Sequence, residues 1–278
     1  MVRLVGPAAL AVATTTASAS EPPTRSRVLV VTGGAAAMGR AYLDHFATLP
    51  GWRGVGVTRS RALESSPHAF VAGVDLLDAD VTSRSLQRLA SHGADELVLV
   101  HAVGSFAFEA DGHPRCDDDC DGIDDTVYHS NVTTFVNAAR ALLELARSSC
   151  CRLTLCAFGS VADRYRVRQW QSYTRSKDLL RAFIRNTTAH APGSVRGVFV
   201  NVSTTDTGNE RVLRPFADAR HWLTPSEVAM ASAPYLTRWR DGWVELDVVN
   251  TDHRISPEDH YAEERVLARW YREMGIAR

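Results

Sequence analysis

The feature that most constrains the fold of this 278-residue chain is an alternation, from Arg27 onward, of short apolar runs with longer helical patterns. The short runs are rich in Val and Leu, as buried strands are, and they lie at 27–32, 54–58, 70–74, 96–101, 153–156, 195–202 and 243–249. Segments with helical spacing separate them, at 38–49, 83–92, 131–148, 173–189 and 225–238. The pattern predicts an α/β fold: a doubly wound, seven-stranded parallel sheet with helices on both faces.

One domain, over residues 26–278, is expected, because 45% apolar residues are enough for a large core and no repeat or interior linker divides the chain. Residues 1–25 have a different composition. Arg3 precedes an apolar stretch, and 17–19 has the Ala-Ser-Ala form of a cleavage site, but Gly6-Pro7 interrupts the apolar stretch. We expect a disordered leader or a weak signal-like segment there, with the protein in the cytoplasm and export as the alternative.

Charge and hydropathy exclude several classes of partner. Lys and Arg total 31 against 32 Asp and Glu, for a net charge of −1, so no basic field is available to bind nucleic acid. No segment approaches the roughly 18 continuous apolar residues of a membrane span, so no membrane partner is expected. The five cysteines form an odd, clustered set rather than a disulfide framework, which favours a reducing compartment.

The first predicted strand leads into a turn of small residues, Gly33-Gly-Ala-Ala-Ala37-Met38-Gly39. Small side chains let the backbone approach a pyrophosphate closely, and the amides and dipole at the start of the next helix attract its charge. This arrangement is typical of a Rossmann-type dinucleotide site, with Gly33, Ala37, Met38 and Gly39 as candidate cofactor-binding residues.

The end of the second predicted strand indicates which dinucleotide is bound. An acidic residue at this place selects the free ribose hydroxyl of NAD, whereas this chain has Thr58-Arg59-Ser60-Arg61. Arg59 can bind a phosphate through two hydrogen bonds, and no carboxylate competes for it. The sequence therefore predicts NADP (NADPH) rather than NAD as the cofactor.

Further along the chain, a set of three residues has the spacing of an acid–base site. Ser160 ends a predicted strand, Tyr173 follows thirteen positions later, and Lys177 lies one helical turn beyond Tyr173. Tyr173 and Lys177 share a helix face, and a cation close to a phenol lowers its pKa. We predict that Tyr173 is an acid–base catalyst whose pKa Lys177 lowers toward neutrality.

From about Arg27 to its end, the chain resembles the short-chain dehydrogenase/reductase family. The glycine turn, Asp75-Leu76, His101-Ala102-Val103-Gly104, Asn131 and the Ser160, Tyr173 and Lys177 set follow that family's order and spacing. The resemblance implies that Tyr173 donates or accepts the proton, Ser160 orients the substrate carbonyl, and Asn131 holds the water of a proton relay. It implies that Lys177 also binds the nicotinamide ribose, that Asp75 and Leu76 bracket the adenine, and that Ala102 and Gly104 contact the cofactor. It further implies a homodimer or homotetramer.

The chain departs from the family pattern at three places. Ala37 replaces the middle glycine, and His101 replaces an asparagine, so we interpret His101 as a hydrogen-bonded strand-end residue. The loop after the sixth predicted strand, Ser203 to Trp222, is similar to that of dihydropteridine-reductase-type members, which implies that Thr207 contacts the nicotinamide carboxamide.

The function predicted is therefore that of an NADP-dependent oxidoreductase that interconverts a small carbonyl compound, a ketone or aldehyde, and its alcohol. One alternative is a dihydropteridine-like or other C=N reductase, which the loop after Val202 favours. Another is a dinucleotide-sensing protein without turnover. A pure sensor does not need Ser160, Tyr173 and Lys177, so their presence argues against it. Trp170, Phe216 and Trp222 are candidates for an apolar pocket wall.

No metal site is expected. Asp117 to Gly122 matches the first half of a calcium loop, but Tyr128 stands where the bidentate Glu belongs. Cys116, Cys120 and His113 have no evident fourth ligand for zinc.

Overall fold

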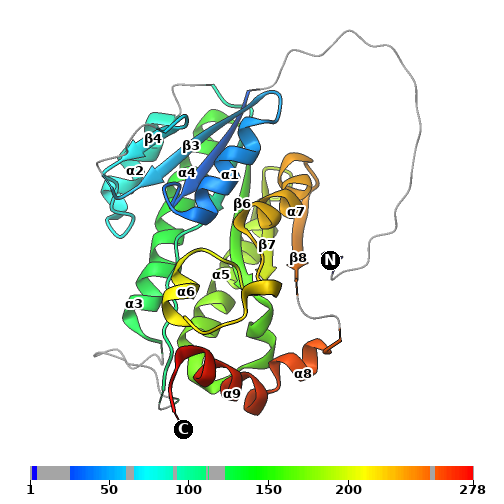
Figure 1. Cartoon of the computed structure of the whole chain (residues 1–278). Helices are drawn as coiled ribbons and strands as arrows, with labels where there is room; N and C mark the ends of the chain where they lie inside the picture. Colours follow the sequence, from blue (N-terminus) through cyan, green and yellow to red (C-terminus); the bar gives the residue numbers. More distant parts are fainter. Residues whose placement is uncertain are drawn as a thin grey trace, which may run out of the picture.

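A computed structural model describes residues 2–4, 26–60, 66–89, 93–110, 112, 123–250 and 254–277, and its centre is one twisted sheet (Figure 1). Seven strands run parallel in the order β4-β3-β2-β5-β6-β7-β8. They are β2 (Arg27–Thr32), β3 (Trp52–Thr58), β4 (Ala69–Ala72), β5 (Glu96–His101), β6 (Arg152–Ser160), β7 (Val195–Val202) and β8 (Gly242–Val248). The order reverses between β2 and β5, where the two halves of a doubly wound sheet meet. The seven-stranded parallel sheet predicted from the sequence is confirmed.

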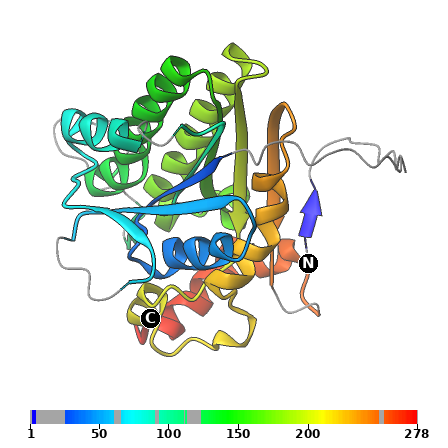
Figure 2. The same ribbon diagram turned by 90° about the horizontal axis from the view of Figure 1, so that it is seen from above.

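Helices cover both faces of the sheet (Figure 2). One face carries α1 (Ala37–Ala47) and α7 (Pro225–Thr237), and the other carries α2 (Ala79–Gln87), α4 (Thr134–Ser149) and α5 (Gln171–His190). Side chains of β2 alternate between the two layers: Leu29 and Val31 pack with α1 and α7, whereas Val28 and Val30 pack on the opposite side. Burial on both faces explains why the strand reads as one continuous apolar run.

An eighth strand lies at the edge of the sheet. β1 (Val2–Leu4) pairs antiparallel with β8, with Val2 opposite Val248 and Leu4 opposite Leu246. The sequence predicted no strand within residues 1–25, and β1 corrects that expectation for residues 2–4. Three residues are too few to show a strand period, and an open edge strand offers backbone hydrogen bonds to almost any extended segment. Residues 5–25 lie outside the described residues.

Short helices gather at the carboxyl ends of the parallel strands (Figure 1). They are α3 (Asp125–Tyr128), α6 (Asn209–Leu213), α8 (Pro257–Tyr261) and the longer α9 (Glu263–Met274). Val266 and Leu267 of α9 are buried against Val167 and Trp170, which precede α5. This contact places α9 at the carboxyl end of the sheet, the end at which the glycine turn also lies.

The described ranges contain no helix that is both long and apolar enough to span a bilayer. Within those ranges, no three His, Cys, Asp or Glu side chains are grouped so as to hold a metal ion. The acidic loop Asp117 to Gly122, with His113, Cys116 and Cys120, lies outside the described residues.

Candidate active site

The glycine turn connects β2 to α1 as the sequence predicted, and its conformation requires small residues. Gly33 has a φ of +70°, and a Cβ there would lie 2.9 Å from the carbonyl oxygen of Ala102. A Cβ on Gly39 would overlap the carbonyl oxygen of Gly33. The first turn of α1 contains no acidic residue, and its N-cap Ala36 supplies no side-chain hydrogen bond. The positive end of the helix is therefore available to an anion from outside the chain.

The β3 and β4 ends lie beside this turn. Arg59 follows β3 directly and is exposed, and no carboxylate is bonded to it among the described residues. Asp75 follows β4, and one of its carboxylate oxygens accepts a hydrogen bond from the amide of Leu77 at 3.0 Å. The side chain of Leu76 is buried, and its carbonyl accepts a hydrogen bond from Asn137 at 2.9 Å. Asp75 and Leu76 are thus held in a fixed turn.

The segment after β5 passes between the glycine turn and α5. The amide of Ala102 donates to the carbonyl of Thr32 at 3.1 Å, which fixes Ala102 beside the turn. A Cβ on Gly104 would lie 2.9 Å from Oδ1 of Asn131 and 3.7 Å from Nζ of Lys177. Glycine at this position therefore lets the chain pass close to two predicted site residues.

His101 is fully engaged at the end of β5. Its Nδ1 lies 2.7 Å from the Thr32 hydroxyl and its Nε2 lies 3.3 Å from the Thr134 hydroxyl. Burial, with a contribution from the charge of Lys177, lowers the pKa of His101 to about 3. The imidazole is therefore neutral at physiological pH, and a hydroxyl group occupies each ring nitrogen. This agrees with the interpretation of His101 as a hydrogen-bonded strand-end residue rather than an acid–base catalyst.

Asn131 lies in a five-residue π-helical turn, His129–Thr133, between α3 and α4. Its Oδ1 accepts a hydrogen bond from the Ser105 amide at 2.7 Å. Its Nδ2 donates to the Ser105 carbonyl at 3.1 Å and to the Ser176 hydroxyl at 2.8 Å. The side-chain amide therefore ties the segment after β5 to the helix that carries Tyr173 and Lys177.

Ser160, at the end of β6, is the N-cap of a short 3-10 turn, Val161–Tyr165. Its Oγ accepts a hydrogen bond from the Ala162 amide at 3.1 Å, and its own amide donates to Asp163 at 2.9 Å. Because the cap uses Oγ as an acceptor, the hydroxyl hydrogen remains available to donate to another group.

Tyr173 and Lys177 lie one turn apart in α5, as predicted, with Nζ of Lys177 at 4.9 Å from the centre of the Tyr173 ring. The electrostatics differ from the prediction. Burial raises the pKa of Tyr173 well above its ordinary value, and the carboxylates of Asp163 and Glu210 raise it further. Burial also lowers the pKa of Lys177, which Asp163 partly offsets. The predicted lowering of the phenol pKa is wrong for the protein alone, because Lys177 is itself desolvated and carboxylates are close.

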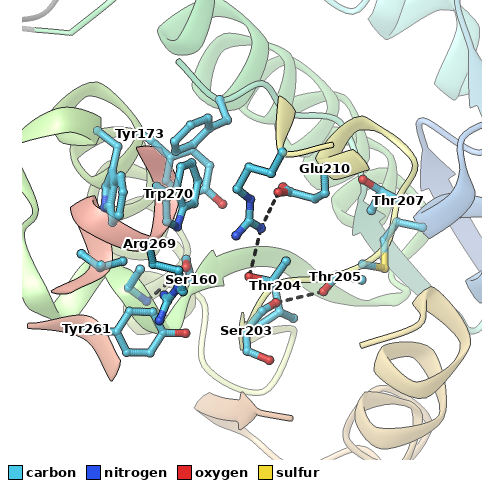
Figure 3. A pocket seen from close by; sticks show the side chains of 17 residues that line it. Ser160, Tyr173, Ser203, Thr204, Thr205, Thr207, Glu210, Tyr261, Arg269 and Trp270 are labelled. Carbon is cyan, nitrogen blue, oxygen red and sulfur yellow. Dashed lines mark hydrogen bonds and ion pairs between the residues drawn. The ribbon is translucent and has the colours of Figure 1, made fainter. Parts of the chain in front are cut away.

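Ser160 and Tyr173 border one cavity of about 190 Å³, shown in Figure 3. Met38 from the start of α1 and Thr207 from the loop after β7 line it too, so parts of the predicted cofactor site and the acid–base residues share the cavity. Lys177 and Asn131 lie behind this surface, because both side chains are buried.

Much of the rest of the cavity wall was missed by the sequence reasoning. It consists of Phe106, Glu210 and Arg214 together with Tyr261, Arg269 and Trp270 from the end of the chain. Trp170 does line the cavity as predicted, but Phe216 is 73% exposed and Trp222 packs against Arg211 and Arg214. The one local signal was the apolar spacing of Val266, Leu267 and Trp270, which indicates an amphipathic helix but not where it docks.

No protein-family model and no curated protein matches the sequence. Solved structures match the fold over about four fifths of this chain. An aldohexose dehydrogenase from Thermoplasma acidophilum is 17% identical with a TM-score of 0.64, and the match covers 81% of this chain and 93% of that one. A short-chain dehydrogenase from Shigella flexneri complexed with NADP is 19% identical with a TM-score of 0.64, covering 80% and 97%. A 3-ketoacyl-(acyl-carrier-protein) reductase from Brucella melitensis complexed with NADH is 18% identical with a TM-score of 0.62, covering 81% and 98%.

Proposed function

Because the chain has the fold of the short-chain dehydrogenases and reductases, we propose that it is an NADP-dependent oxidoreductase that reduces a small ketone or aldehyde to an alcohol. The observation that carries this proposal is the cavity bordered by Ser160 and Tyr173, with Lys177 behind the phenol and the glycine turn at its edge. The reverse oxidation uses the same residues.

The residues at the glycine turn fit a dinucleotide. The uncapped start of α1, at Ala37 and Met38, suits a pyrophosphate, and Gly33 and Gly39 allow the close approach. Asp75 and Leu76 would border the adenine, while Ala102, Gly104, Thr207 and Lys177 would hold the nicotinamide half. When bound, the nicotinamide of NADPH supplies the hydride.

The preference for NADP over NAD rests on Arg59. Its guanidinium is exposed at the end of β3, where a carboxylate would have to stand to bind the free ribose hydroxyl of NAD. A guanidinium instead favours a ribose phosphate, which it can bind through two parallel hydrogen bonds.

Tyr173 is proposed as the proton donor to the carbonyl oxygen. The phenol carries its proton at neutral pH, and its raised pKa makes that proton harder to release than the proton of an exposed tyrosine. Ser160 donates its free hydroxyl hydrogen to the same oxygen and so holds the carbonyl in place. Asn131 fixes the position of α5 through Ser176, and Lys177 holds positive charge near the phenol.

A homodimer or homotetramer in the cytoplasm is proposed on the resemblance to the family alone. Light scattering after size-exclusion chromatography tests the assembly, and mass spectrometry of the native chain tests whether residues 1–25 are removed.

The proposed activity is tested with a panel of aldehydes, ketones and a quinonoid dihydropterin, each followed at the NADPH absorbance band with NADH as comparison. Oxidation of NADPH by a ketone or aldehyde is the expected result. Reduction of the dihydropterin alone would favour the C=N alternative. Cofactor binding without turnover of any substrate would favour the sensing protein.

A further inference from the structure

Arg269 is a charged residue in the wall of the cavity that the proposed reaction does not use. Burial of Val266 and Leu267 docks α9 on the carboxyl ends of the strands, and this directs Arg269 and Trp270 to the cavity. Figure 3 shows Ser160, Tyr261 and Arg269 at one side of the cavity, with Glu210 and Thr207 at the other. The Arg269 side chain is 26% exposed, so most of its surface is out of water.

The guanidinium of Arg269 is only partly used within the chain. Its Nη1 lies 3.3 Å from the carbonyl oxygen and 3.2 Å from Nδ1 of His260. Its Nε lies 3.8 Å from Glu273, which is too long for a hydrogen bond. In the described part of the chain, Nε and Nη2 of Arg269 therefore keep hydrogens that bond to no protein acceptor.

Arg214, the other guanidinium in the wall, uses both of its Nη atoms, while its buried Nε has no hydrogen-bond partner among the described residues. It bonds to Glu210 at 2.9 Å and to Glu273 at 3.0 Å, and it stacks on Trp270 with its centre 4.3 Å from the ring. Glu273 thus already has a closer partner than Arg269. The two arginines and two glutamates balance in formal charge. Arg269 keeps free donors at Nε and Nη2, whereas Arg214 keeps only its buried Nε.

Tyr261 supplies a second free donor beside Arg269. Its hydroxyl makes no hydrogen bond to the described residues, and it borders the same cavity. Burial raises the pKa of Tyr261 to about 12, while the charge of Arg269 opposes that rise, so the hydroxyl keeps its proton. A guanidinium and a phenol hydroxyl on one side of a cavity are suited to a carboxylate.

Aromatic rings form the remaining wall next to Tyr173. Phe106 lies 5.3 Å from both the Tyr173 and the Trp270 ring centres, and Trp170 lies 4.9 Å from Trp270. These rings pack on one another, and together they give the cavity an apolar aromatic wall beside Tyr173, which suits an aryl group of the substrate.

We propose that the substrate is an aryl keto acid, whose carboxylate binds Arg269 and Tyr261 and whose ring packs on Phe106 and Trp270. This inference rests on the proposed function and assigns its substrate class. The carbonyl carbon would receive the hydride that NADPH supplies, which leaves NADP, and the carbonyl oxygen would receive the Tyr173 proton. Solvent then returns a proton to the Tyr173 phenolate, and the product is the corresponding hydroxy acid.

The test compares keto acids with their neutral methyl esters, using benzoylformate, phenylpyruvate and benzoylpropionate to vary the spacing between carbonyl and carboxylate. We expect at least one acid to have a kcat/KM about tenfold or more above that of its ester, since charge-assisted hydrogen bonds contribute on this scale. Arg269→Gln should abolish that preference mainly through KM for the acid, with the ester unaffected. Arg272→Gln is the matched control, because Arg272 is exposed on the same helix, and it should leave the preference intact.

A binding measurement separates the two proposals. Calorimetry with hydrocinnamate, which has the ring and carboxylate but no ketone, should show binding to the full chain that Arg269→Gln weakens by about tenfold or more. If esters are reduced as well as acids and hydrocinnamate does not bind, the carboxylate site is refuted while the proposed reductase stands. If hydrocinnamate binding depends on Arg269 but no carbonyl compound is reduced, the reductase is refuted while the carboxylate site stands.

Discussion

Replacing Tyr173 by Phe should remove turnover while leaving the protein folded and able to bind NADPH. The hydroxyl makes no hydrogen bond to the described residues, so the substitution leaves no buried partner unsatisfied. The ring contact with Phe106 and the position of the Lys177 ammonium over the ring are kept, because both involve the ring rather than the hydroxyl. The variant therefore isolates the proton of Tyr173.

The substitution should change the catalytic rate greatly and the stability of the fold very little. Removing a general acid lowers kcat by about a hundred- to ten-thousandfold, equivalent to about 3–5 kcal/mol of transition-state stabilisation. The free energy of unfolding should change by less than about 1 kcal/mol, because only an unpaired hydroxyl is lost.

The assay is single-turnover oxidation of NADPH at saturating carbonyl substrate, with NADPH binding and thermal unfolding measured on the same samples. Tyr235→Phe is the matched control, since Tyr235 is half-buried in α7 and does not line the cavity. If Tyr173→Phe kept wild-type turnover, the assignment of the acid would be refuted. If it lost NADPH binding as well as turnover, a purely structural role would be indicated instead.

Three further outcomes are expected. Arg59→Asp should shift the ratio of NADPH to NADH affinity by more than about tenfold toward NADH, since a charge-assisted contact contributes about 1.5–3 kcal/mol. Titration of both cofactors measures this ratio, and an unchanged ratio would contradict the NADP assignment. Gly39→Ala should weaken NADPH binding and lower the free energy of unfolding by about 1–3 kcal/mol, because the new Cβ overlaps the Gly33 carbonyl. Gly54→Ala is the control: its Cβ meets the end of the Leu43 side chain, so the loss of stability should be smaller. Equal losses of stability, measured by thermal unfolding, would contradict the packing argument. His101 should make the fold acid-sensitive: its folded pKa of about 3 lies below its ordinary value of about 6.5, so the unfolded chain takes up the extra proton and stability falls as pH drops through that window. Melting curves from about pH 7 to pH 4 should therefore favour His101→Asn over wild type increasingly toward low pH, and a constant difference would refute the assignment.

Local sequence patterns were sufficient for the features that depend on neighbouring residues. The continuous apolar run Val28 to Val31 is read directly as a strand covered on both faces, and the structure gives it partners on both. The glycine turn was likewise readable, because the positive φ of Gly33 and the close packing of Gly39 are demands that few other residues meet. The spacing of Tyr173 and Lys177 predicted a shared helix face for the same reason.

Features that depend on docking between distant segments were not readable. The sequence offered the aromatic residue Phe216 as a candidate for the pocket wall, but the loop turns it outward, where Gly275 leaves room for its ring. Trp270 takes that role instead, because α9 returns across the strand ends. Burial of Val266 and Leu267 drives this return, and no local pattern indicates which surface receives them.

Burial at the carboxyl ends of the strands removes water from the acid–base groups and shifts their pKa values. Burial raises the pKa of Tyr173 and lowers those of His101 and Lys177, so each shift favours the neutral form of the group. For Tyr173 the neutral form is the proton donor, and the Asp163 carboxylate, held by the amide of Ser160 at 2.9 Å, strengthens that preference. The 3-10 turn that exposes the Ser160 hydroxyl to a substrate thus also places the Asp163 carboxyl group near Tyr173. Burial is nevertheless the larger cause of the raised pKa of the phenol, and the same burial raises the pKa of Asp163 to about 7.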